Sequence, residues 1–332
     1  MAVRPDGRAA TIADVAAAAA VSQATVSRVV NGKSTVDPAI AQRVLDVVES
    51  LGYRPSIVAR NLARGTTQTV AVVVPDLGNP MFQEVLRGVT RAAAAAGFRV
   101  LVADSEESPA DEPQLALEAR RRCDAVVLVA PRMTEAELVE LLPRLSPVVL
   151  VNRSLDGVSD VGVDYAAGAI AAVEHLARLG HKHIAYLAGP PSSESNRRRL
   201  SGLELAGQAH PSVVVTTIPC GANIADGAAA ADGLGDATAV IAFNDLVAFG
   251  LLAALRDRGI DVPGRVSVVG FDDIEFAGFA TPPLTTLAVP RRELGARAWD
   301  ALAAEIAGGE PVVPVVFTPT LVERASTGPV HR

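Results

Sequence analysis

The 332-residue chain has few of the features that mark disulfide-bonded, metal-binding or membrane-spanning proteins. Its two cysteines, Cys123 and Cys220, are far apart and belong to no CxxC or Cys/His cluster, so neither a disulfide framework nor a metal site is expected. No uninterrupted run of about 18 apolar residues is present, and the N-terminal stretch MAVRPDGRAA lacks the apolar core of a signal peptide. These absences predict a soluble protein that stays in the cytoplasm and has no membrane partner.

Motifs of catalysis are missing as well. No GxGxxG or GxxxxGK[ST] sequence follows an expected strand, and no Ser/His/Asp or paired-carboxylate arrangement stands out. His181 and His183, in GHKHIAYLAG, have no metal-ligand pattern around them and are interpreted as structural. The sequence therefore predicts no catalytic residue, no cofactor and no enzymatic activity.

The formal net charge of −7 is at first sight unfavourable for a nucleic-acid partner, because cations dominate binding to phosphates. The charges are unevenly distributed, however. Residues 1–65 carry eight basic and five acidic side chains, a net charge of +3, whereas the remainder carries 22 basic and 32 acidic ones, a net charge of −10. A basic N-terminal segment on an acidic body is compatible with DNA binding, although this modest asymmetry alone does not indicate it.

What the sequence does contain is an N-terminal stretch, TIADVAAAAAVSQATVSRVVNG, that has the pattern of two short helices joined by a tight turn. Thr11 and Asp14 have the spacing of a capping box, which predicts that the first helix begins directly after Thr11. Ser22 is a second N-cap and opens a second helix at Gln23. The stretch is therefore predicted to be a helix-turn-helix.

The predicted second helix has two chemically different faces. Val26, Val29 and Val30 form its apolar face. The opposite face consists of polar or small residues: Gln23, Ala24, Ser27, Arg28 and Asn31. Gln can pair with the edge of adenine and Arg can donate two hydrogen bonds to guanine in the major groove, which admits an α-helix. The alternative is that this polar face is merely solvated.

A third helix and a short hinge follow. Asp37 and Pro38 provide an N-cap and an N1 proline, and Gly52 ends the helix. Its buried side is expected to comprise Ile40, Val44, Leu45, Val48 and Leu51. The next segment, SIVARNLARG, places the apolar Val58 and Leu62 one turn apart and is too short to be a stable helix alone. It is either a hinge helix supported by a partner or a linker whose apolar residues cover the body.

From Thr69 onward, short β-branched runs alternate with helical segments, which is typical of βα units around parallel sheets. A first set of predicted strands comprises Val70 to Val74, Arg99 to Ala103, Ala125 to Val129 and Val148 to Val151. A second set comprises Ile184 to Ala188, Val213 to Ile218, Val240 to Phe243 and Val266 to Phe271. The predicted helices include Pro80 to Ala96, Ala166 to Leu179, Leu246 to Arg258 and Arg291 to Ala307. The fold class is thus an all-α head plus an α/β body of two doubly wound lobes.

Polar side chains follow several of the predicted strands, at the sheet edge where α/β proteins bind ligands. They are Asp76 to Phe82, Asn152 and Arg153, Pro190 to Arg199, Asn244 and Asp245, and Asp272 and Asp273. Charged, amide and hydroxyl groups that converge from several loops suit a small polyhydroxylated ligand. Each of them has a simpler alternative: Asn79 and the Asn244–Asp245 pair can be helix caps, and Arg197, Arg198 and Arg199 can be a solvated run.

The motifs TIADVA, VSQATVSRVVNG and LGYRPSIVARNLARG resemble the N-terminal signature of the LacI/GalR family of bacterial transcription regulators. The resemblance implies that Gln23, Ala24 and Arg28 read bases, that Thr25 and Ser27 contact the DNA backbone, and that Leu62 is wedged into the minor groove. One departure is Ala20, which stands where the family usually has a turn glycine. Because glycine tolerates left-handed conformations, Ala20 predicts a different turn or local strain.

The body resembles the same family through NPMFQEVLRG, VNR, GHKHIAYLAGP, FNDLVAFG, SVVGFDD and PPLTTL. The family fold is similar to that of periplasmic sugar-binding proteins, with an effector between two lobes. The resemblance assigns effector contacts to Met81, Phe82, Arg199, Asn244 and Asp272. Two departures are that Ala222 or Asn223 stands where many members have a stacking aromatic ring, and that Val289 replaces a common Gln.

Three parts of the chain are therefore expected: a DNA-binding head over 1–54, a hinge over 55–66, and an effector-binding and dimerisation domain over 67–332. Within the last, the first lobe is expected at about 67–164 and 290–316, and the second at about 165–289 and 317–328.

The leading interpretation is a repressor that binds a pseudo-palindromic operator as a homodimer or larger assembly, controlled by a sugar-like effector. The alternatives are a ligand-binding protein without DNA function and an enzyme on a nucleotide-binding fold.

Overall fold

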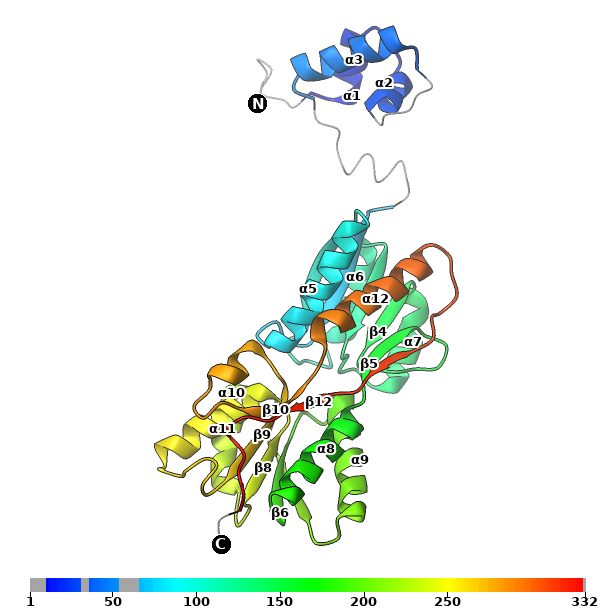
Figure 1. The fold of residues 1–332 in the computed structure, drawn as a ribbon. Helices are drawn as coiled ribbons and strands as arrows, with labels where there is room; N and C mark the ends of the chain where they lie inside the picture. Colours follow the sequence, from blue (N-terminus) through cyan, green and yellow to red (C-terminus); the bar gives the residue numbers. More distant parts are fainter. Residues whose placement is uncertain (1–9, 31–35, 54–65, 331–332) are drawn as a thin grey trace. The chain divides into compact units, whose positions relative to one another are not determined.

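The computed structural model describes residues 10–30, 36–53 and 66–330, and the chain divides into two units, Met1–Thr67 and Gln68–Arg332 (Figure 1). Leu62 and nearly all of the predicted hinge lie outside the described residues, as does Asn31. No helix in the described segments is both long enough and apolar enough to span a membrane.

The described residues of the first unit form the helices α1 (Ile12–Ala18), α2 (Gln23–Val30) and α3 (Pro38–Ser50). The predicted capping box is present, because the Thr11 amide donates to the Asp14 carboxylate at 2.9 Å and the Asp14 amide donates to the Thr11 hydroxyl at 3.3 Å. At the second helix, the Thr25 amide donates to the Ser22 hydroxyl at 3.1 Å. Local capping thus sets the start of both helices where the sequence predicts it.

At the centre of this unit's core, each helix contributes one fully buried valine, Val15, Val26 or Val44, and Val29 and small side chains pack around them. The prediction that Leu45 faces this core is wrong, since its side chain is 46% exposed. Adjacent residues of a helix point about 100° apart, so only one of Val44 and Leu45 can occupy the centre of the interface. The smaller Val44 occupies it.

The second unit contains two six-stranded sheets, each the centre of one lobe (Figure 1). The first sheet has the order β11-β5-β4-β3-β1-β2, and all its strand pairs are parallel. Its strands are β1 (Thr69–Val74), β2 (Arg99–Asp104), β3 (Ala125–Val129), β4 (Val148–Val151), β5 (Asp160–Val163) and β11 (Val315–Phe317). Buried apolar runs such as β3 are typical of parallel sheets covered on both faces.

The second sheet has the order β12-β10-β9-β8-β6-β7. Its strands are β6 (His183–Ala188), β7 (Val214–Pro219), β8 (Ala239–Ala242), β9 (Ser267–Asp272), β10 (Thr285–Ala288) and β12 (Thr320–Val322). Only the edge strand β12 runs antiparallel to its neighbour among the described pairs. The predicted strand runs are confirmed, whereas the short strands β5, β10, β11 and β12 were not predicted.

Helices cover both sheets. Those of the first lobe are α5 (Pro80–Ala95), α6 (Glu112–Arg122), α7 (Glu135–Leu145) and α12 (Arg291–Ile306). Those of the second lobe are α8 (Tyr165–Arg178), α9 (Glu194–Ala209), α10 (Ile224–Ala229) and α11 (Asp245–Asp257), with the 3-10 turns η1 (Ala230–Gly233) and η2 (Glu275–Phe279). Helix α12 lies beside α5, α8 beside α9, and α10 beside α11 (Figure 1).

The chain passes between the lobes three times: from β5 to α8, from β10 to α12 and from β11 to β12. Each lobe is therefore built from segments that are far apart in the sequence. Because the strands of both sheets are almost all parallel, the loops after their carboxyl ends gather at one edge of each sheet. This arrangement supplies the polar side chains of the site described below.

Ala20, in the turn between α1 and α2, has a φ of 53°. This left-handed conformation costs a residue with a Cβ atom roughly 1–2 kcal/mol and costs glycine almost nothing. We therefore expect Ala20→Gly to stabilise the head by roughly 0.5–1 kcal/mol. Hydrogen-exchange protection of the α1 and α2 amides in the full chain measures the effect.

The matched control is Ala17→Gly, which makes the same chemical change at an exposed helical position and should destabilise by about 1 kcal/mol. If both substitutions lower protection alike, the turn at Ala20 stores no strain.

Candidate functional site

The outward face of α2 is the first candidate site. Gln23, Ala24 and Arg28 are exposed, whereas Thr25 and Ser27 are half-buried. The opposite face is fixed because Val26 and Val29 are buried in the three-helix core. The helix thus presents an amide and a guanidinium on one rigid surface, which is the chemistry that reads adenine and guanine edges in a major groove.

The second candidate site is a cavity between the two sheets of the body. All five residues predicted to contact an effector line it, together with others that come from the same strand ends. Its lining comprises Asn79, Met81, Phe82, Glu107, Ala130, Arg132, Asn152, Tyr165, Ser195, Arg199, Ala222, Phe243, Asn244 and Asp272. Its free volume is about 20 Å³, which is room for about one water molecule. The lobes are therefore closed on each other at this point.

The side of the cavity that belongs to the first lobe is built at the start of α5. Asn79 caps this helix by accepting a hydrogen bond from the Met81 amide at 2.9 Å, and Pro80 occupies the first turn, where its missing N–H costs nothing. The cap directs Met81 and Phe82 toward the cavity, and both are buried. They supply an apolar wall.

Arg199, on α9, is the central side chain of the second lobe's wall. It is only 2% exposed, and its guanidinium carbon lies 3.9 Å from the ring centre of Phe271, 4.3 Å from that of Tyr165 and 4.7 Å from that of Phe243. Its Nε and Nη1 have no hydrogen-bond partner. Because a buried donor without a partner is costly, these nitrogens are set to donate to a ligand.

The run of three arginines on α9 has two different roles. Arg197 and Arg198 are exposed and pair with Glu194 on their own helix, so the alternative of a solvated run holds for these two but is wrong for Arg199, which is buried. Arg199 differs, because the next position on the helix points into the body. The three aromatic rings then hold its guanidinium by cation–π attraction.

Asp272 ends β9 and faces the same cavity with a backbone φ of 105°. Its side chain is 5% exposed, and burial raises its pKa to about 7, while the charges of Arg199 and Arg291 act in the opposite direction. Neither unpartnered nitrogen of Arg199 donates to this carboxyl. A strong donor and an acceptor thus line one cavity without satisfying each other.

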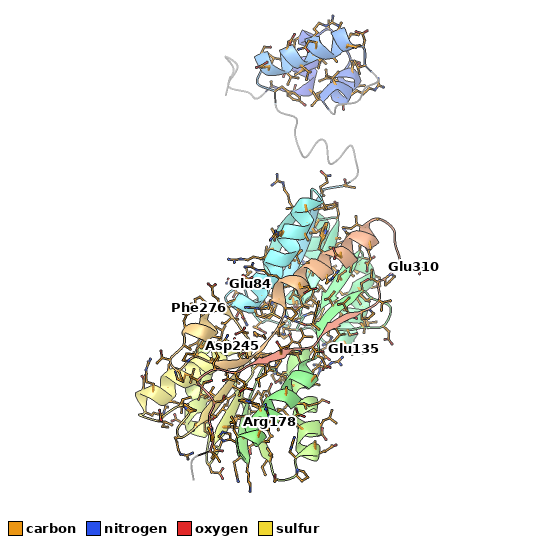
Figure 2. The ribbon with its side chains drawn as sticks, viewed as in Figure 1. Glu84, Glu135, Arg178, Asp245, Phe276 and Glu310 are labelled. Carbon is orange, nitrogen blue, oxygen red and sulfur yellow. The ribbon has the colours of Figure 1, made fainter. Side chains whose placement is uncertain are left out.

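Asn244 and Asp245 both make hydrogen bonds that hold the second lobe together. Asn244 caps α11 by accepting from the Val247 amide at 2.9 Å, and its Nδ2 donates to the Ala222 carbonyl at 2.8 Å. Asp245 is fully buried and accepts from the Thr286 hydroxyl at 2.6 Å. Figure 2 labels two side chains of the second lobe, Asp245, which is buried, and Phe276, which is exposed.

The first lobe contains an ion pair that was not predicted from the sequence. Arg132 follows β3, is buried, and donates to Glu107, which follows β2, at 2.8 Å. Glu112 holds the same loop by accepting from the Arg132 and Met133 amides at 2.7 and 2.8 Å. Both Arg132 and Glu107 line the cavity, and the strand-end rule could have found them had it been applied to every strand.

Two further features bear on the chemistry. Ala222, half-buried, lines the cavity, so no aromatic ring stands there, and the rings near the cavity pack on Arg199 instead. Within residues 10–30, 36–53 and 66–330, no group of three or more His, Cys, Asp or Glu side chains is arranged to hold a metal ion. The site is therefore suited to holding a polar organic ligand by hydrogen bonds.

Comparisons with known proteins agree with both sites. Residues 11–56 match the model described as "Bacterial regulatory proteins, lacI family", and residues 173–327 match a "Periplasmic binding protein-like domain". The transcriptional regulator GalR of Escherichia coli K12 is 36% identical over 329 residues, covering 96% of this chain and 95% of that protein.

Solved structures give the same result. A lac repressor dimer bound to operator and the anti-inducer ONPF has a TM-score of 0.86 at 26% identity, covering 97% of this chain and all of that one. The complex of the transcriptional regulator CelR with cellobiose has a TM-score of 0.70 at 30% identity, covering 96% and 99% of the two chains.

A helix-turn-helix head joined to a two-lobed body of the periplasmic-binding-protein type defines a class of DNA-binding regulators. Within that class, this chain belongs to the LacI family of bacterial transcription regulators.

The burial of Asp272 generates a pH-dependent prediction. The folded carboxyl keeps its proton up to about pH 7, whereas the unfolded one loses it near pH 3.8, so the folded state binds more protons between these values. The contribution of Asp272 to stability is therefore present at low pH and is lost as pH rises through this window. Asp272→Asn should gain stability relative to the parent between pH 4 and pH 8, by about 1.4 kcal/mol per pH unit at most.

Urea unfolding of the two proteins across this pH range measures the difference. Asp257→Asn, at an exposed position on α11, is the matched control for the Asp-to-Asn change itself. A pH-independent difference for Asp272→Asn would mean that the carboxyl is ionised throughout the range.

Proposed function

We propose that this regulator is a repressor that binds a pseudo-palindromic operator as a homodimer and is controlled by a neutral, polyhydroxylated effector held between the lobes. The observation that carries the proposal is Arg199, a buried guanidinium with two unpartnered donors in a cavity that also contains Asp272. A sugar hydroxyl accepts from such donors and donates to such a carboxyl at once. Of the other charged side chains that line the cavity, Arg132 and Glu107 pair with each other.

For the head, we propose that Gln23, Ala24 and Arg28 read bases and that Thr25 and Ser27 contact the phosphate backbone. The support for the base-reading residues is that all three are exposed on α2, and Thr25 and Ser27 are half-buried beside them. Leu62 is proposed as the minor-groove wedge of a hinge over 55–66. The similar lac repressor dimer, which is bound to operator and to the anti-inducer ONPF, supports the pairing of DNA with a small molecule on this fold.

For the body, Met81, Phe82, Arg199, Asn244 and Asp272 are proposed as effector contacts. Because the cavity has room for only about one water molecule, an effector must separate the walls to enter. Such movement changes the relation of the two lobes, and the coupling to DNA equals the difference in effector affinity between the two states, typically about 1–3 kcal/mol.

We further propose a cytoplasmic location and no enzymatic activity, in keeping with relatives that are regulators. A ligand-binding protein without DNA function is the alternative, and the exposed reading face of α2 speaks against it.

The head assignment is tested with Arg28→Ala. A bidentate arginine–guanine pair contributes roughly 1–3 kcal/mol of base discrimination, so operator affinity should fall about 5- to 150-fold while affinity for random duplex hardly changes. Arg43→Ala, at an exposed position on α3, is the control for lost charge. Fluorescence anisotropy on both DNAs gives the affinities, and equal losses on both would place Arg28 at the phosphates.

The body assignment is tested with Arg199→Ala. Each lost hydrogen bond to a charged group costs roughly 1.5–3 kcal/mol, so effector affinity should fall by at least about tenfold while operator binding persists. The neighbouring Arg197→Ala removes an exposed guanidinium of the same helix and should bind effector normally. Isothermal titration with an effector found by thermal-shift screening decides the matter, and unchanged affinity of Arg199→Ala would move the site elsewhere.

A further inference from the structure

A second, larger cavity adjoins the one that contains Arg199. It lies between the segments that follow β4 and β5, the start of α9, and β11. Its lining comprises Asn152, Arg153, Ser154, Asp160, Gly162, Val163, Asp164, Tyr165, Glu194, Arg198, Pro314 and Val316. Its free volume is about 260 Å³, against about 20 Å³ for the first cavity. Of these two cavities, the second therefore has more space for a ligand.

The two cavities share part of their walls, because Asn152 and Tyr165 line both of them. Tyr165 is one of the rings that pack on the Arg199 guanidinium. Asn152 is 6% exposed and has a left-handed backbone, and its Oδ1 has no hydrogen-bond partner. A buried amide oxygen without a donor, at the boundary of two cavities, indicates a ligand that supplies the donor.

Gly162 is the reason that the second cavity is open. It lies in β5 with Val316 of β11 as its strand partner. A Cβ atom built at Gly162 meets no atom within 4 Å, and its φ is not in the left-handed region. Backbone geometry does not require glycine at this position. Any larger side chain in the strand would occupy part of the cavity.

The charged groups around the second cavity already have partners. Asp160 accepts from the Ser154 hydroxyl at 3.0 Å, and Asp164 caps α8 by accepting from the Ala167 amide at 2.9 Å. Glu194 accepts from Arg198 at 2.9 Å, and Arg153 lies 3.7 Å from the same carboxylate.

An ionic ligand would have to break one of these pairs, at a cost in desolvation. A neutral ligand rich in hydroxyl groups can add hydrogen bonds to all of them, because each carboxylate and guanidinium has spare acceptor or donor positions.

We propose that the second cavity is a subsite for the second ring of a two-ring glycoside, whose first ring contacts Arg199 and Asp272. This inference rests on the proposed function. Asn152 lines both cavities, and in this proposal its unpartnered Oδ1 accepts a hydrogen bond from the ligand. The effector is then a disaccharide or a similar glycoside and not a single sugar.

The test compares monosaccharides with disaccharides on the full chain. Glucose, galactose, cellobiose, lactose, maltose and melibiose are titrated by isothermal calorimetry against the parent, Gly162→Leu and Gly207→Leu. The last is the matched control, because Gly207 also meets no atom within 4 Å but lies on α9 and does not line the cavity. Gly162→Ala is a milder filling of the same space in case Gly162→Leu does not fold.

The expected result is that at least one disaccharide binds the parent at least tenfold more tightly than either of its component sugars. Gly162→Leu should abolish that advantage, Gly162→Ala should reduce it, and Gly207→Leu should preserve it. Operator affinity without sugar should be the same in all four proteins.

Three results overturn the proposal. If a monosaccharide binds as tightly as any disaccharide, or if Gly162→Leu binds disaccharides as the parent does, the second cavity is no subsite, although effector control stands. If none of the six sugars binds, the second cavity is not a saccharide subsite. The operator assay does not depend on this result and tests DNA binding by itself.

Discussion

The body is organised around one buried cation. The Arg199 guanidinium has lost its water and has gained three aromatic rings but no salt bridge through Nε or Nη1. Burying a charge in this way is expensive unless something compensates it, and ring quadrupoles compensate only part. The part of this desolvation cost that the rings do not offset favours a ligand that accepts hydrogen bonds from Arg199. The neighbouring buried carboxyl of Asp272, with its raised pKa, extends this polar, water-poor region across the end of β9.

The fold explains why these groups meet. Parallel strands end at one edge of each sheet, and the three passages between the lobes bring the two edges face to face. Met81 from the first lobe and Arg199 from the second thus line one cavity although they are more than a hundred residues apart in the sequence. The sheets hold the loops rigidly, so a ligand that enters the narrow space acts on whole lobes and not on single side chains.

Much of this could be predicted from the sequence where the cause is local. The Thr11–Asp14 capping box and the uninterrupted apolar run of β3 are readable because neighbouring residues determine them. Leu45 was misplaced because helical periodicity gives a face but not its centre. The pairing of Arg132 with Glu107 was missed because it joins two loops, and no local pattern encodes which loops meet.

Family resemblance selected Arg199 from a run of three arginines, but its stacking on Phe271 depends on packing between a helix and a distant strand. Similarly, the sequence raised capping as an alternative role for Asn244, and only the structure gives both of its hydrogen bonds. The hinge remains a sequence prediction, because Leu62 lies outside the described residues.

The position of β11 has a consequence for how the chain acquires its structure during synthesis. Strand β11 (Val315–Phe317) completes the first sheet at the edge of β5 (Asp160–Val163), about half the chain earlier. A growing chain therefore carries an unpaired strand edge at β5, and α5 lacks its neighbour α12, until almost all of the body has left the ribosome. Contacts of such long sequence separation form slowly, and exposed strand edges invite association with other chains. The nascent protein is thus most vulnerable to aggregation in the interval between synthesis of β5 and arrival of β11.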